Sequence, residues 1–240
     1  MVQIGSFALT LFPKLNSEKN LSSFGSFSSE KLNAFFAKQS YQFVQPTPNA
    51  NSFDPSFTFE KIPFRAVINQ NRLDLSYLTL SKSFPKDFED IASSLQKEIM
   101  LFIDEGTVTT TRLAVNVDLL FDDHDYVISK KLVSFFPFAK ETVPGEFAIH
   151  YNSIGTVSKK DPKCVINHLL TINQAVFPIR VSDTETKAAP FLIVHIDANT
   201  SPLFILSKNQ KDFFKELLDL TLSDLTGIAD ALEGRADEKK

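Results

Sequence analysis

Three histidines in the C-terminal half of the chain come nearest to a constellation that could do chemistry. His150, His168 and His195 each lie in a segment with strand character, and residues of one parity share a face of a sheet. If these strands are neighbours, the three imidazoles could converge as ligands of a catalytic zinc ion, with Asp118 or Asp197 orienting one ring. No two of the histidines stand at a tight ligand spacing, so three unrelated histidines are the competing interpretation.

Two groups of acidic residues could hold a metal ion. The run at 122–125, Asp-Asp-His-Asp, offers carboxylate oxygens that suit a hard cation, but it lacks the Gly and the distal Glu of an EF-hand loop. Asp183, Glu185 and Lys187 have the acidic-x-Lys ending of a nuclease magnesium site. A nuclease would carry them on a strand, whereas this segment has the composition of a hairpin loop. A solvated turn is therefore the favoured interpretation of both groups.

The sequence contains no motif of serine or nucleotide-phosphate chemistry. There is no Gly-x-Ser-x-Gly elbow, no Walker A sequence and no Gly-x-Gly-x-x-Gly, and glycine is scarce at seven residues. Cys164 opens a strand without an obvious neighbouring base, so we expect a small buried side chain rather than a nucleophile. As the single cysteine, it also excludes an intrachain disulfide and fits a reducing compartment.

Phenylalanine is the unusual feature of the composition, with 24 residues and no tryptophan. Phe is a large apolar side chain without a polar group to satisfy, so we expect most of these residues in the core. Phe135, Phe136 and Phe138 form a dense cluster that we interpret as an exposed aromatic patch, because such patches usually mark a partner site. These three residues are the predicted binding surface for a protein partner.

The elements that must position these residues can be read from the apolar periodicity. The pattern predicts helices over 29–38, about 84–104 and about 208–233, the last beginning with a Ser-x-x-Gln capping box at 207–210. It predicts strands over 2–12, 57–80 (two paired strands), 109–121, 126–136, 146–154, 164–181 and 190–198. Runs of strands closed by helices indicate an α+β fold with a largely antiparallel sheet, packed by the central and C-terminal helices. We expect one domain over 1–240, with a subdomain boundary, if any, in the Pro/Asn-rich loop 45–56.

The overall composition is that of a globular protein, with 43% hydrophobic and 22% charged residues. The net charge of −4 argues against a general nucleic-acid binder, since phosphate binding usually shows as a basic excess. The N-terminal residues lack the basic region and the cleavage site of a signal peptide, and no stretch approaches the roughly 20 apolar residues of a membrane helix. We therefore expect a cytoplasmic protein without a membrane segment.

From about Phe57 to Gly234, the layout resembles a poorly characterised bacterial family that is scattered sporadically among genomes. The similarity lies in the paired strands and helix before TTTRLAVNVDLLF, then PGEFAIHYNS, FLIVHIDANT and the closing helix KDFFKELLDLTLSDLTGIADALEG. The first 50 residues do not match this layout. The resemblance implies a bacterial or phage protein of α+β fold, in a defence or toxin–antitoxin setting, and it supplies no catalytic motif.

Three functions are consistent with these features. The leading hypothesis is a non-catalytic binding or adaptor protein, which engages a protein partner or a second copy of itself through Phe135, Phe136 and Phe138 and needs no cofactor. The first alternative is a metal-dependent hydrolase or nuclease that holds zinc on His150, His168 and His195. The second alternative is a small-ligand-binding protein with a pocket between sheet and helix.

Overall fold

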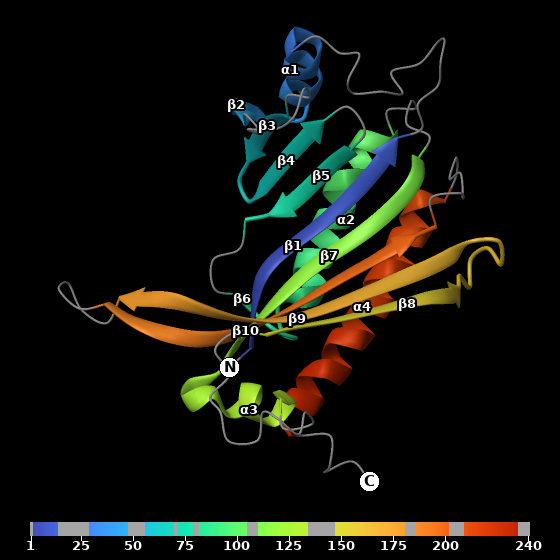
Figure 1. Ribbon diagram of the computed structural model, residues 1–240. Coiled ribbons are helices and arrows are strands. Elements are labelled where there is room, and N and C mark those ends of the chain that lie inside the picture. The colour runs from blue at the N-terminus through green and yellow to red at the C-terminus, as the bar shows by residue number, and fades with distance from the viewer. Residues whose placement is uncertain are drawn as a thin grey trace.

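The computed structural model describes residues 2–13, 29–47, 56–69, 72–78, 82–104, 110–133, 147–180, 186–201 and 209–234 (Figure 1). Its strands are β1 (Val2–Pro13), β2 (Gln42–Thr47), β3 (Ser56–Lys61), β4 (Phe64–Asn69), β5 (Arg72–Tyr77), β6 (Lys82–Ser83), β7 (Thr110–Asp122), β8 (Ala148–Val157), β9 (Val165–Arg180) and β10 (Thr186–Thr200). Its helices are α1 (Ser29–Lys38), α2 (Phe88–Asp104), the short 3-10 helix η2 (His124–Tyr126), α3 (Val127–Val133) and α4 (Gln210–Leu232).

One antiparallel sheet organises these elements in the order β2-β3-β4-β5-β1-β7-β10-β9-β8, with β6 pairing beside it on β1. Helices α2 and α4 lie behind this sheet in Figure 1, and both contact its central strands. The predicted α+β class, the antiparallel sheet and the two packing helices are therefore confirmed. We call the face that packs on α2 and α4 the covered face, and its opposite the open face.

Successive side chains of a strand point to opposite faces of the sheet, and this alternation decides which of them enter the core. In β1, Phe7 and Leu9 are fully buried on the covered face, where they pair in register with Val117 and Val115 of β7. Phe7 packs on Phe88 of α2 with ring centroids 4.8 Å apart. The expected role of phenylalanine in the core is confirmed for the buried residues Phe7, Phe36, Phe59, Phe64, Phe84, Phe88, Phe102, Phe121, Phe213 and Phe214.

The strand predicted over 126–136 is wrong, because the described part of this segment forms η2 and α3. The buried carboxylate of Asp123 accepts hydrogen bonds from the backbone N–H of Ile128, at 2.7 Å, and from the N–H and hydroxyl of Ser129. Such contacts satisfy the free donors at a helix start, which the apolar alternation of the sequence does not reveal. Asp123 is thus a buried helix-capping residue and not part of a solvated turn.

Two smaller boundaries also differ from the prediction. The segment 57–68 forms two strands, β3 and β4, joined by a tight turn at Ile62 and Pro63. Helix α4 begins at Gln210 with Asn209 as its N-cap, so the predicted capping box does not start the helix, and Ser207 lies outside the described residues.

Strands β2 and β3, which flank the Pro/Asn-rich loop, pair with each other within the one sheet. Among the described helices, none is long and apolar enough to cross a membrane.

A buried glutamate ties the turn after β8 to α4. The Glu216 carboxylate accepts a hydrogen bond from the Ser158 hydroxyl at 2.5 Å and another from the Lys159 backbone N–H at 2.6 Å. Glu216 is only 8% exposed, and Ser158 is buried as well. Because both carboxylate oxygens are used, this one side chain fixes the β8–β9 hairpin against the helix.

We predict that Glu216→Ala lowers the free energy of unfolding by about 2–3 kcal/mol, since it leaves two donors without an acceptor. Urea denaturation of the variant measures this loss. Lys215→Ala, at an exposed position of α4 next to Glu216, is the control and should change stability by less than about 0.5 kcal/mol. Equal stability of the two variants would show that the glutamate does not hold the hairpin.

Candidate functional site

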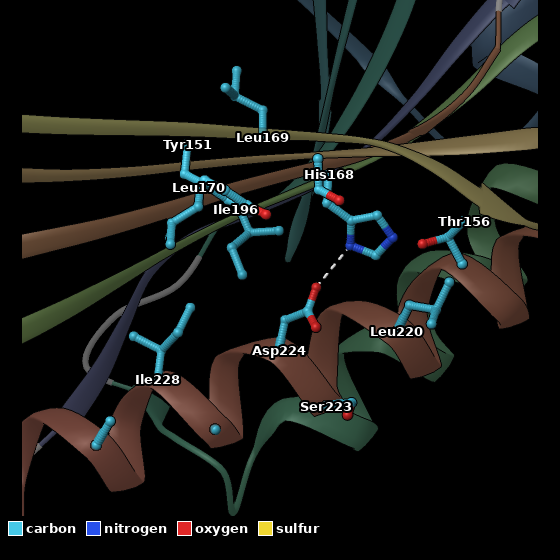
Figure 2. Close-up of a pocket in the computed structure, with 13 residues that line it drawn as sticks. Tyr151, Thr156, His168, Leu169, Leu170, Ile196, Leu220, Ser223, Asp224 and Ile228 are labelled. Carbon is cyan, nitrogen blue, oxygen red and sulfur yellow. Dashed lines mark hydrogen bonds and ion pairs between the residues drawn. The ribbon is translucent and has the colours of Figure 1, made fainter.

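Strands β8, β9 and β10 and helix α4 line an open pocket of about 540 Å³, which we call the β8–α4 cavity (Figure 2). Its lining is mainly apolar, with a few hydroxyl groups and a single His–Asp pair. The residues that line it are Tyr151, Ser153, Thr156, His168, Leu169, Leu170, Ile196, Leu220, Ser223, Asp224, Gly227, Ile228 and Ala231.

Helix α4 supplies its wall through two rows of side chains at a spacing of four residues. Residues four apart lie on one helix face, so Leu220, Asp224 and Ile228 form one row towards the sheet (Figure 2). The second row contains only small residues, Ser223, Gly227 and Ala231. These small side chains leave the space that larger ones would fill.

A β-bulge in β8 aims a further hydroxyl into the cavity. Ser153 pairs with His168 and Ile154 with Asn167, but the next pair is Thr156 with Ile166, so one residue of β8 is extra. The extra residue is Gly155, whose φ of +117° is strained for any residue with a side chain. The bulge shifts the alternation by one, which places both Ser153 and Thr156 in the lining.

The His–Asp pair is the polar centre of the cavity. His168 Nδ1 lies 2.7 Å from Asp224 Oδ2, so the contact joins β9 to α4 (Figure 2). A carboxylate can only accept, so this hydrogen bond places a proton on Nδ1. His168 Nε2 is buried and has no hydrogen-bond partner among the described residues. The Asp224 carboxylate is partly exposed, so the polar group in the wall that a bound molecule can reach is this carboxylate.

The other two predicted metal histidines lie on the open face. Residues of five strands stand in one row across that face, in the order Ser6, Asp118, His195, Thr171 and His150. Asp118 accepts from the Ser6 hydroxyl at 2.5 Å and from His195 Nδ1 at 2.6 Å, and His150 Nδ1 lies 3.1 Å from the Thr171 hydroxyl. This row agrees with the expectation that Asp118 lies close to a histidine.

The His195–Asp118 contact shifts both groups towards their charged forms. Burial alone would raise the pKa of Asp118, but the hydrogen bonds from His195 and Ser6 lower it below its ordinary value. The hydrogen bond to Asp118 raises the pKa of His195, against the opposing effect of burial and with a further contribution from Asp197. The pair is thus an ion pair over the pH range between the two shifted values.

The structure does not bring the three histidines together. His168 points to the covered face, whereas Thr171, three residues later on the same strand, shares the open face with His150 and His195. Within the described ranges, no group of three or more His, Cys, Asp or Glu side chains is placed to hold a metal ion. Asp197 also lies on the open face, beside His195.

The remaining candidate residues are dispersed. Cys164 is fully buried, as expected, and burial raises the pKa of its thiol to about 11. In the acidic run 122–125, His124 Nε2 lies 3.1 Å from Asp122, next to the capping Asp123. Lys187 is an exposed residue of β10. Outside the described residues lie Asp183, Glu185, Phe135, Phe136 and Phe138, so the predicted partner surface stays a prediction.

Comparison with known proteins does not identify this site: no family model, no curated protein and no solved structure matches the chain. Asp224, Ser153 and Thr156 were not among the site residues predicted from the sequence. A signal for Asp224 was present, because this acid interrupts the apolar stripe of α4 just as His168 interrupts the apolar alternation of β9. Two polar residues on faces that are expected to pack together are candidates for a hydrogen-bonded pair.

We predict that Gly227→Ala raises the free energy of unfolding by about 0.5–1 kcal/mol, because glycine is unfavourable inside a helix. A Cβ at this position meets no atom within 4 Å, so the methyl group causes no clash. Thermal or urea denaturation measures the gain, with Gly155→Ala as the matched control. The control should instead lose stability, because Gly155 has a φ of +117°. A loss at both positions would contradict the open space beside Gly227.

We predict that the stability advantage of the wild type over His195→Gln decreases as the pH rises from 6 to 9. The raised pKa of His195 means that its stabilisation is complete below the ordinary imidazole value of about 6.5 and disappears as the folded-state pKa is passed. The lowered pKa of Asp118 means that its own contribution is lost only on acidification. Urea denaturation at several pH values gives the difference, and a difference that is constant over this range would contradict the ion pair.

Proposed function

We propose that this protein binds a small, uncharged and largely apolar molecule in the β8–α4 cavity. The single observation that carries this proposal is the mainly apolar β8–α4 cavity itself, with the partly exposed carboxylate of Asp224 in its wall. A ligand hydroxyl or N–H group can donate a hydrogen bond to this carboxylate.

The size and lining of the cavity support the same ligand class. A volume of about 540 Å³ lies within the range of roughly 300–1,000 Å³ that is usual for small-molecule sites. Leu170, Ile196 and Ile228 offer apolar contacts to the body of a ligand. The lining contains no lysine or arginine, and its one acidic group, Asp224, disfavours an anion. A neutral molecule with one donor group is the best match.

This proposal corresponds to one of the alternatives predicted from the sequence, and it differs from the leading one. The adaptor hypothesis depends on Phe135, Phe136 and Phe138, and the described residues neither support nor oppose it. The zinc hypothesis depends on convergence of His150, His168 and His195, and the sheet separates them onto two faces. The cavity needs none of these conditions.

We expect 2-naphthol to bind the protein about tenfold more tightly than naphthalene, because only the former can donate a hydrogen bond to the Asp224 carboxylate. The anion 2-naphthoate should bind more weakly than both. Isothermal titration or ligand fluorescence measures the three dissociation constants. Since 2-naphthol has a volume well below that of the cavity, steric exclusion would not explain a failure.

Two variants make this experiment specific for the site. Asp224→Leu should remove the preference for 2-naphthol over naphthalene, whereas His150→Leu, on the open face, should leave it unchanged. Gly227→Leu should weaken both ligands, because its side chain would occupy the cavity. Absence of binding at millimolar concentration, or equal effects of Asp224→Leu and His150→Leu, would overturn the proposal.

A further inference from the structure

We infer that two copies of this chain form a two-fold symmetric dimer in which their β8 strands pair edge to edge, with Tyr151 at the symmetry axis. The two sheets then form one continuous antiparallel sheet. This inference concerns the outer edge of the sheet, and it does not depend on a ligand in the β8–α4 cavity.

Strand β8 lies at one edge of the sheet, and half of its backbone groups point away from the protein (Figure 1). Gln174 of β9 donates its N–H to the Phe147 carbonyl, so the odd-numbered residues of 147–153 direct their N–H and C=O groups towards β9. The residues between them direct theirs outwards, where no described strand pairs with them; these are Ala148, His150 and Asn152. Such groups can form the ladder of a further antiparallel strand.

The two edges of the sheet differ in how they are protected. Natural edge strands avoid pairing with other chains through short length, proline, charged side chains or bulges. The opposite edge, β2, has six residues, contains Pro46, and has a register irregularity between Phe43 and Gln45. Strand β8 has ten residues and contains no Pro, Asp, Glu, Lys or Arg, and its bulge at Gly155 lies near its end. The regular stretch 148–154 is therefore open to a partner strand.

The charge pattern of this stretch fits a second copy of the same strand. In a two-fold antiparallel pair, residues near the axis lie close to their own counterparts, so a charged side chain there would meet a like charge. The stretch has no such side chain. Its central residue is Tyr151, and a pair centred there places His150 opposite Asn152 of the second copy, twice. Imidazole and carboxamide groups can hydrogen-bond, whereas a pair centred on His150 would oppose two imidazoles.

The backbone geometry agrees with this centre. His150 and Asn152 are the residues whose groups point outwards, so they form the hydrogen-bonded pairs between the two copies. Tyr151 then faces its counterpart in a non-hydrogen-bonded pair, with Cα atoms about 4.5 Å apart. Its side chain is 61% exposed in the single chain. Aromatic pairs of this kind stabilise neighbouring strands, so the dimer gives this exposed ring a partner.

The contact extends from the strand onto α4. Seven paired residues fall short of the roughly 20–30 residues that each partner of a stable interface contributes. Across the cavity mouth from Tyr151, α4 presents the exposed small residues Ser223, Gly227 and Ala231. The two copies of α4 lie on the same side of the continuous sheet, and small side chains allow helices to approach closely. The second copy thereby covers the open side of each cavity.

The first test is the mass of the purified full-length chain in solution, measured by sedimentation velocity over a range of micromolar concentrations. We expect a dimer. Asn152→Pro should make the protein monomeric, because it removes an outward N–H and leaves the hydrogen bonds between β8 and β9 intact. Asn152→Thr keeps this N–H and is the matched control, which should remain dimeric. A wild type that is monomeric at high micromolar concentration would overturn the inference.

A cysteine at the axis tests the register in a chain with an unbroken strand. Tyr151→Cys should form an intermolecular disulfide on mild oxidation, because a Cα separation of about 4.5 Å lies within the disulfide range. Ser153→Cys is the control, since a rise of four residues, about 13 Å, separates position 153 from its counterpart. The buried Cys164 is common to both variants. Equal cross-linking of the two variants would contradict the register and the inference with it.

A charge at the axis provides an independent measurement. Tyr151→Lys places two ammonium groups opposite each other and should raise the dimer dissociation constant at least about tenfold, an effect that high salt reduces. Tyr151→Phe is its control and should keep the wild-type constant. Thermal denaturation shows whether each variant is folded. All these measurements are made without ligand, so a monomeric protein that binds 2-naphthol refutes the dimer alone, and a dimer that binds none refutes the proposed function alone.

Discussion

The buried carboxylate of Glu216 is the constraint on which the geometry of the site depends. It holds the turn at Ser158 and Lys159 against α4, and the core contacts of that helix with β7 and β10 fix the rest of its length. Asp224 lies eight residues further along the same helix, a rise of about 12 Å. The helix therefore contacts the β8–β9 hairpin at both points, through Glu216 and through Asp224, and the β8–α4 cavity lies beside the second contact.

The pleat of β9 then gives two histidines different environments. His168 points to α4, where its Nδ1 contacts the carboxylate of Asp224, and its buried Nε2 has no partner among the described residues. His195, on the next strand and the opposite face, lies in a row of polar side chains in which Asp118 is shared with Ser6. The same residue type thus contacts a carboxylate of α4 on the covered face and a carboxylate of the sheet itself on the open face. The difference arises because successive residues of a strand face opposite sides of the sheet, and the two histidines occupy positions on opposite sides.

The sequence predicted elements well where one periodicity dominated, and poorly where a single contact decided the outcome. The stripes of α2 and α4 and the alternation of β1, β7 and β10 were sufficient for the fold class. The segment 126–136 has the alternation of a strand, but the buried Asp123 carboxylate starts a helix there. For the site, His168 was identified but grouped with the wrong neighbours, because strand register and the Gly155 bulge arise from pairing between distant segments.

Three local costs converge on the cavity, and each has a simple alternative that the chain does not use. Gly227 stands in the middle of a helix where alanine would be more stable, and Gly155 holds a φ of +117° in a strand that could run without a bulge. His168 leaves a buried nitrogen unsatisfied where a leucine would pack. Folded proteins tend to concentrate such violations of local preference at functional sites. The three costs lie on three different elements, β8, β9 and α4. The folding of any one of these elements therefore does not explain all three. Their common product is an open cavity with an acceptor in its wall.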